Sequence, residues 1–401
     1  MLKFLPKISL DSAMYKVVLF MALVVPLSTA AASIAICFGT LFIVGWSLKN
    51  KSLPQFDSEV LGVLATYLVC QIFIAALSLE PSISFREVFG ELHRFFPLIF
   101  AMTFIKKREQ LCGVMIATLL AALINSAAGI YQYFVMDAPR AYGFTNTPTT
   151  YGPVMIMQLP ILIFIAQLKI MPQIWRGVSI LTAGLTLLAL LLSMTRASWL
   201  ALGGMIIIFV ALNKNYRFIT AKICAGLTTI LLIASLVSPQ IQDRFSTIFD
   251  ANFQSNTERV LMWKSAINIF SDYPIHGIGQ EMFYEAYNEQ YILPEAKEKA
   301  NEKRNGHTQP QNDILNATCE GGLIGLVSFI GLYAYFLWRF FNQLKREKEF
   351  ILSAGLTAFL IVAALMIEGL MNTYTNMTSL MREFWLLAGM MIAAENILKK
   401  N

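Results

Sequence analysis

The chain has 401 residues, of which 56% are hydrophobic and only 14% are charged, and its mean hydropathy is +0.59. Because soluble domains carry about 25% charged residues, this composition excludes a soluble globular protein and indicates a polytopic membrane protein. The net charge of +6 identifies no acidic partner, since the placement of basic residues matters more in a membrane protein. The five cysteines lie in or beside apolar runs, without the spacing of a disulfide framework or a zinc site.

Apolar segments near the ~20 residues that cross a bilayer core follow one another along most of the chain. We expect an all-α protein with twelve transmembrane spans, at approximately 15–30, 32–48, 59–78, 88–105, 111–135, 152–170, 177–194, 197–213, 219–237, 311–338, 351–371 and 379–397. One long polar segment separates the ninth span from the tenth. The expected organisation is therefore nine spans in residues 1–237, a loop with amphipathic helices in 238–310, and three spans in 311–401.

Basic residues set the expected orientation, because cytoplasmic loops collect Lys and Arg. With both termini in the cytoplasm, every inside connection carries at least two positive charges, and most of the 31 Lys and Arg residues lie inside. The loop at 238–310 is then periplasmic, and the protein belongs to the inner membrane of a diderm bacterium. All three histidines, His93, His276 and His307, fall at this outer face.

Two arginines of the outer face stand in short connections. Arg140 lies in the connection that begins at Asp137, and Arg196 lies in the tight turn 193–199 between two apolar runs. An arginine surrounded by hydrocarbon is costly unless it is paired or bound to an anion. The alternative that Arg196 is an interfacial anchor, with its charged end reaching the polar surface, stays open.

The outer loop begins with a predicted helix at 257–270. Its apolar residues Val260, Leu261, Trp263, Ile267 and Phe270 come close to helical spacing, which predicts an amphipathic helix lying on the membrane. The proline and glycines of 272–279 end this helix. The charged stretch 281–304 is expected to be helical and to present a solvated face.

The tenth span opens with polar side chains that would be costly in contact with lipid. We expect them to line a cavity, and they are Gln311, Asn312, Asp313, Asn316 and Glu320. Asp313 and Glu320 either orient a histidine or an arginine or simply pack at the head of the helix.

Parts of this region resemble a known superfamily. Residues 311–315 and 320–326, together with a set of positions in 257–279, resemble the O-antigen ligases and polymerases; the set comprises Arg259, Trp263, Ala266, Ile269, Pro274, Gly277 and Gly279. Arg196 with Leu200 also matches the Arg-x-x-x-Leu signature of the ligases. The resemblance implies a GT-C-type membrane glycosyltransferase that takes glycan from undecaprenyl pyrophosphate and needs no metal, cofactor or nucleotide sugar. In the ligases the acceptor is a sugar hydroxyl of the lipid A core.

The chemistry of the residues agrees with this implication. A pyrophosphate at a membrane surface calls for arginines, whose planar forks bind phosphate oxygens in pairs, and we assign this role to Arg140, Arg196 and Arg259. Attack by a hydroxyl calls for a base that is neutral near pH 7, which histidine provides. The outer loop contains no compact carboxylate cluster that resembles a cation site.

One position departs from the family pattern. The resemblance places the family's histidine at Gln311, and glutamine cannot act as a general base. We favour the hypothesis that His307, four residues upstream, is the catalytic base and that Gln311 holds the acceptor or the phosphate. Two alternatives stay open: a mechanism without a protein base, driven by stabilisation of the leaving group, and an inactive paralogue. His276 fits a turn residue better, and His93 either faces the cavity or caps a helix end.

The sequence therefore favours an O-antigen ligase. Within the same superfamily, a polymerase or a protein O-oligosaccharyltransferase is the alternative. A transporter of lipid-linked sugars is disfavoured, because transporters place their unusual residues near the bilayer midplane, whereas here they gather at the outer surface.

Overall fold

The computed structural model describes residues 9–212, 239–247, 250, 253–296, 309–345 and 353–398, and these residues form helices and connecting loops. In chain order the helices are α1 (Leu10–Val24), α2 (Thr29–Asn50), α3 (Ser58–Ala76), α4 (Pro81–Leu92), α5 (Phe96–Phe104), α6 (Arg108–Phe134), α7 (Pro148–Gln167), α8 (Gln173–Leu192), α9 (Arg196–Leu212), α11 (Pro239–Ser246), α12 (Gln254–Asp272), α13 (Phe283–Ala286), the π-helix η2 (Tyr287–Tyr291), α15 (Asp313–Leu344), α16 (Ala354–Gly369) and α17 (Thr378–Leu398).

The expected membrane character is confirmed in its general form. Six of the described helices, α2, α3, α6, α7, α8 and α15, are long and apolar enough to cross a bilayer, and α9 and α16 are shorter apolar helices. The expected span 219–237 lies outside the described residues. The chain is thus a multi-pass membrane protein, and the count of twelve spans stays a prediction.

The expected fourth span, 88–105, is wrong as a single helix. The structure divides it into α4 and the nine-residue α5, with a break at residues 93–95. Proline lacks the N–H that a helix interior needs but fits the first turn, and the break puts Pro97 into the first turn of α5. Two glutamates of α4, Glu87 and Glu91, thereby lie beside the break rather than in a continuous span.

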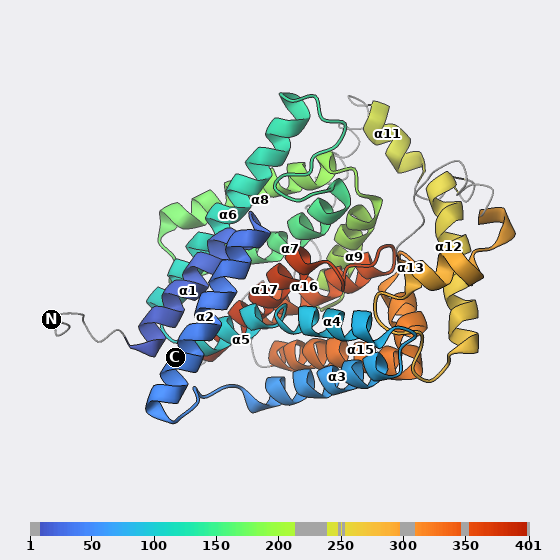
Figure 1. The fold of residues 1–401 in the computed structure, drawn as a ribbon. Helices are drawn as coiled ribbons and strands as arrows, with labels where there is room; N and C mark the ends of the chain where they lie inside the picture. The colour runs from blue at the N-terminus through green and yellow to red at the C-terminus, as the bar shows by residue number, and fades with distance from the viewer. Residues whose placement is uncertain are drawn as a thin grey trace.

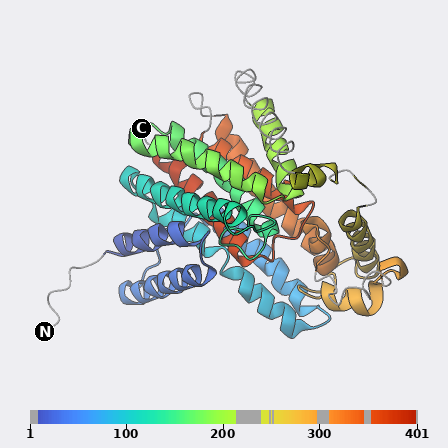
Figure 2. The ribbon, with the colours of Figure 1, turned by 90° about the horizontal axis from the view of Figure 1, so that it is seen from above.

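The bundle is built around α17, which is buried along almost its whole length. It packs against α5, α7 and α16, while α3 flanks α15 and α8 flanks α6 and α7. Figures 1 and 2 show α11, α12 and α13 gathered at one end of the bundle, where they form a cap over the ends of α9, α15 and α16. We call this the capped end.

The cap has a small apolar core of its own. Residues of α12, including Met262, Ala266 and Ile269, pack against Phe283, Tyr287 and other residues of α13 and η2. The predicted helix at 257–270 is therefore confirmed, although much of its apolar surface faces protein. Within 281–296 the charged residues Glu285, Glu289 and Glu295 are exposed, as expected for a solvated face, whereas Tyr287 and Tyr291 are buried against the cap. Residues 297–304 lie outside the described part.

The cap is joined to the bundle at a break in α15. Gly322 has φ 59° and ψ −152° in the middle of this helix, so the helical hydrogen bonds that would run from Leu323 and Ile324 to the carbonyls four residues earlier are lost. The 274–279 segment replaces them. Leu323 and Ile324 donate to the carbonyls of Pro274 and Ile275 at 2.8 and 3.1 Å.

The same segment also satisfies the two carbonyls that the break frees. Ile278 donates to the carbonyl of Cys319 at 3.1 Å, and Gly279 donates to that of Glu320 at 2.8 Å. All four backbone groups are thus paired, which is required of non-helical backbone at membrane depth. We call these four bonds the backbone clamp.

Glycine is needed on both sides of the clamp. A Cβ added to Gly277 would lie 2.4 Å from the backbone of Glu320, and one added to Gly322 would lie 2.4 Å from the backbone of Ile275. Both residues also have positive φ, a conformation that other residues adopt only with strain. The Pro-x-x-Gly-x-Gly and Glu-Gly-Gly patterns in the sequence therefore encode this contact.

Gly322→Ala should destabilise the protein by about 2–4 kcal/mol, because backbone strain and a backbone overlap act together. The melting temperature in detergent measures the effect. Gly331→Ala, in the same helix with open space around its Cβ position, is the matched control and should be neutral or stabilising, since alanine favours helix. Equal melting temperatures for the two variants would contradict this account of the clamp.

Candidate functional site

Four arginines from separate segments come together at the capped end. Arg140 lies in the loop between α6 and α7, Arg196 begins α9, Arg244 lies on α11 and Arg259 on α12. The charges of Arg244 and Arg196 act on Arg140, and those of Arg259 and Arg244 act on Arg196. The structure therefore brings together the three arginines that the sequence predicted, and adds Arg244. We call these four residues the arginine cluster.

Hydrogen bonds hold Arg140 and Arg196 in place. Arg140 donates through Nε to the carbonyl of Ser193 at 2.7 Å and through a terminal nitrogen to Thr195 Oγ1 at 3.1 Å. Arg196 donates to the carbonyl of Thr247 at 2.6 Å and lies over the ring of Phe253. Since a guanidinium has five N–H donors, both keep donors that no described residue accepts from.

In the part of the chain that the structure describes, no carboxylate is paired with the arginine cluster. Among the described residues, the ion pairs involve Arg94, Lys106 and Arg339 and none of the four clustered arginines. Burial, together with the nearby charges of Arg244 and Arg196, lowers the pKa of Arg140 to about 10. The side chain is still protonated near pH 7. Repelling cations in a partly buried site are costly, and a bound anion would relieve that cost.

The loop between α16 and α17 supports Arg259. This guanidinium donates to Asn372 Oδ1 at 3.1 Å, and Asn372 donates in turn to the hydroxyl of Tyr374 at 2.7 Å. The same hydroxyl lies 3.1 Å from a carboxylate oxygen of Glu368. Asn372, Tyr374 and Glu368 are all buried, so a rigid chain of polar groups runs from α16 to Arg259.

The polar head of α15 holds this same loop. One carboxylate oxygen of Asp313 accepts from the backbone N–H groups of Tyr374 and Thr375 at 2.9 and 3.1 Å and from the Thr375 hydroxyl at 3.0 Å. Asn312 caps α15 and donates to the carbonyl of Leu370 at 3.0 Å. These two expected cavity residues thus anchor the loop. Gln311, the residue before the cap, is half-buried with a positive φ of 55°.

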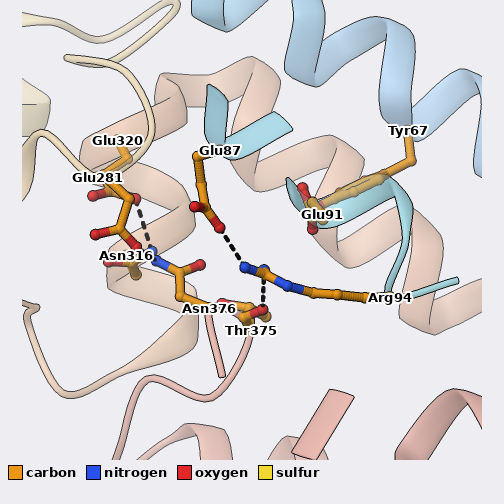
Figure 3. A network of polar contacts seen from close by, with 9 residues as sticks. All are labelled: Tyr67, Glu87, Glu91, Arg94, Glu281, Asn316, Glu320, Thr375 and Asn376. Atoms are coloured by element: carbon orange, nitrogen blue, oxygen red, sulfur yellow. Dashed lines mark hydrogen bonds and ion pairs between the residues drawn. The ribbon is translucent and has the colours of Figure 1, made fainter. Parts of the chain in front are cut away.

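A second polar site also contacts this loop. It is a cavity of about 40 Å³ between α3, α4 and α15, and the carboxylates of Glu87, Glu91 and Glu320 line it together with Arg94. Arg94 pairs with Glu87 and donates to the carbonyl of Thr375 at 2.8 Å (Figure 3). Glu320 and Asn316, two of the residues expected to line a cavity, are among the residues that line this one. We call this the acidic cavity.

Glu281 lies beside the acidic cavity, with its carboxylate near Glu320 in Figure 3. It accepts a hydrogen bond of 2.9 Å from Asn376, and its backbone has a positive φ of 62°. Burial raises the pKa of Glu281 above the ordinary value, and the neighbouring charge of Glu87 raises it further. The folded protein therefore binds a proton at this carboxylate more tightly than the unfolded chain does.

The histidines contribute little to the described site. His307, the expected catalytic base, lies outside the described residues. His276 is half-buried in the 274–279 segment of the backbone clamp and its ring packs against Tyr273, which suits a turn residue. His93 follows the end of α4.

Sequence reasoning missed Arg244, the loop residues Asn372 and Tyr374, and the glutamates of α4. A signal for the glutamates exists, because Glu87, Glu91 and Arg94 recur at helical spacing at the edge of an apolar run, where charge is costly. Nothing comparable marks Asn372 or Tyr374, whose partners come from distant segments.

A comparison with protein families shows that residues 181–330 match the O-antigen ligase family. No curated protein matches the chain. The chain therefore contains an O-antigen ligase family domain from α8 to the middle of α15, and members of this family are membrane glycosyltransferases that act on lipid-linked glycans as ligases or polymerases. The matched range includes Arg196, Arg244, Arg259 and the whole backbone clamp.

Glu281→Gln should change the pH dependence of stability. An acid whose folded pKa is raised destabilises the fold while it is ionised, and this effect disappears as the pH falls towards the unfolded value of about 4.3. The variant cannot ionise and keeps an acceptor for Asn376, so it should melt at a higher temperature than the wild type at pH 7. The difference should shrink by pH 5; a difference that is constant between these pH values would contradict the assignment.

Proposed function

We propose that this protein is an O-antigen ligase. It transfers a glycan from undecaprenyl pyrophosphate to a sugar hydroxyl of the lipid A core, at the periplasmic face and without a metal. The observation that carries the proposal is the arginine cluster, four guanidinium groups from four segments with no carboxylate partner among the described residues. The family match of residues 181–330 supports it.

In the proposed reaction, the main task of the arginine cluster is to stabilise the leaving group. The acceptor oxygen attacks the anomeric carbon, the bond from that carbon to the pyrophosphate breaks, and the pyrophosphate departs with the electron pair. Fixed cations that face the developing negative charge stabilise the transition state. Arginine suits this role because its planar fork meets two phosphate oxygens at once and stays charged near pH 7.

The proton of the acceptor hydroxyl goes to a base, and we propose His307 for this role. Its sequence position supports the proposal, because it precedes Gln311 by four residues. Gln311 holds the acceptor or the phosphate in this scheme. Gln311 has a left-handed backbone and precedes Asn312, whose backbone N–H donates to Thr373 Oγ1 at 3.2 Å. It therefore lies beside the loop that supports Arg259. A mechanism without a protein base and an inactive paralogue are the competing hypotheses.

The same donor site would also serve a polymerase or a protein O-oligosaccharyltransferase. Glycan chain length in a deletion strain separates ligase from polymerase. Loss of all polymer from the lipid A core, with accumulation of lipid-linked polymer, indicates a ligase, whereas a single repeat on the core indicates a polymerase.

Arg196→Lys should lower kcat/KM at least about tenfold, because an ammonium cannot replace the two-pronged contact with phosphate. The assay is transfer from lipid-linked glycan to lipid A core in membranes. Arg176→Lys is the matched control, since Arg176 donates to the carbonyl of Ala166 and lies outside the arginine cluster. If Arg196→Lys keeps wild-type activity, Arg196 is an interfacial anchor.

His307→Ala should reduce transfer at least about a hundredfold, the low end for removal of a general base. The same membrane assay, run beside Gln311→His, measures this. Near-normal activity of His307→Ala would remove His307 from the mechanism and leave stabilisation of the leaving group as the main source of catalysis. No transfer by the wild-type protein would contradict the choice of lipid A core as acceptor.

A further inference from the structure

The acidic cavity contains buried polar atoms without hydrogen-bond partners. Asn316 and Arg94 are only 5% and 4% exposed, yet Asn316 Oδ1 and Arg94 Nε make no hydrogen bond within the described part of the chain. Gln280 Oε1 is unpartnered in the same way, and all three residues line the cavity. Because buried polar groups nearly always have partners, these atoms indicate a site for a ligand.

The unpartnered atoms restrict the chemistry of that ligand. Two of them, on Asn316 and Gln280, accept hydrogen bonds, and Arg94 Nε donates one. A cation offers nothing to the donor, and the carboxylates of the cavity repel an anion. A hydroxyl group both donates and accepts. Among the described residues, no three His, Cys, Asp or Glu side chains converge as metal ligands.

The size of the cavity limits what enters it. A volume of about 40 Å³ is enough for one or two hydroxyl groups and too small for a whole sugar ring, since a water molecule needs ~10–15 Å³ by this measure. The rest of such a ligand must lie outside. The bound portion is therefore the edge of a hydroxyl-bearing molecule.

An apolar groove adjoins the cavity and indicates what the rest of the ligand is. The groove lies between α3 and α15, has a volume of about 720 Å³, and shares Tyr67 with the cavity. Val63, Leu323 and Val327 are among its lining residues. Since α3 and α15 are both candidate membrane spans, a hydrocarbon chain can occupy this groove while hydroxyl groups on the same molecule reach the cavity.

The position of the cavity relates it to the proposed reaction. Arg94 binds the carbonyl of Thr375, and Arg259 binds the side chain of Asn372, three residues earlier in the same loop. The Cα atoms of Asn372 and Thr375 are at most about 11 Å apart. The cavity and the arginine cluster thus contact one short loop, within a few sugar units of each other.

We propose that the acidic cavity is a binding site for the hydroxyl groups of the acceptor sugar, which is carried on a hydrocarbon chain lying in the α3–α15 groove. This inference rests on the proposed function and assigns its acceptor side. Asn316, Gln280 and Arg94 bind the sugar hydroxyls. Asn316 and Arg94 are positioned by Glu320 and Glu87, to which they are bound.

A binding experiment tests the site without the transfer reaction. The full-length protein in lipid nanodiscs is titrated with octyl β-glucoside, below its micellar concentration, and with octyl phosphocholine of the same chain length. Octyl β-glucoside should raise the melting temperature more than octyl phosphocholine does. Asn316→Ala should abolish this difference. Asn372→Ala, at the arginine cluster, is the matched control and should retain it.

Kinetics then separate the two sites. Asn316→Ala should raise KM for the lipid A core acceptor about tenfold, as expected for loss of one or two hydrogen bonds, and leave the donor KM unchanged. Asn372→Ala should raise KM for the donor and leave KM for the acceptor unchanged, because Asn372 supports Arg259. If Asn316→Ala does not fold, Gln280→Leu replaces it with the same expected results.

Two results would overturn the proposal. One is an equal rise in melting temperature with octyl β-glucoside for the wild type and for the cavity variants Asn316→Ala and Gln280→Leu. This result would mean that the cavity holds only water. The other is a rise in the donor KM of Asn316→Ala. If the wild type transfers no glycan to lipid A core, the proposed function fails, while the glucoside titration still decides whether the cavity binds sugar hydroxyls.

Discussion

The backbone clamp is the contact on which the arrangement of the capped end depends. Two helical hydrogen bonds of α15 are opened at Gly322, and the 274–279 segment supplies the four missing partners. An opened helix within a membrane span would be unstable without them. The clamp fixes the end of α12, and therefore places Arg259 relative to the bundle. It also fixes Glu320, whose carbonyl belongs to the clamp and whose side chain lines the acidic cavity.

The α16–α17 loop depends on this arrangement and divides the capped end into two sites of opposite charge. Asp313 accepts three hydrogen bonds from the loop, and Asn372 and Thr375 face different partners, Arg259 and Arg94. Arginines gather at one site, and three glutamates with a single arginine line the other. On the proposed function, such a division suits a reaction between an anionic donor and a neutral hydroxyl acceptor, because charge or missing hydrogen-bond partners would exclude each substrate from the other's site.

Composition and hydropathy were sufficient to predict a helical membrane protein with a polar cap between two groups of helices. The tight turn between two apolar runs also singled out Arg196, and the resemblance of 257–279 to a known superfamily led to Arg259. The break between α4 and α5 was not predicted, because hydropathy is a mean over many residues and the single proline that explains the break changes this mean little. Asn372 and Tyr374 acquire their roles only through contacts with segments far away in the chain, which a local pattern does not contain.

The arginine cluster has a consequence for turnover on the proposed function. A group of fixed cations that stabilises the departing pyrophosphate also binds the free undecaprenyl pyrophosphate that remains afterwards, and the product carries more charge than the substrate did. Release of the spent carrier then competes with chemistry as the slow step. The mutual repulsion among Arg140, Arg196 and Arg244 returns as the product leaves. The rate of the enzyme would thus depend on the concentration of spent carrier lipid in the membrane, and therefore on how fast the cell recycles it.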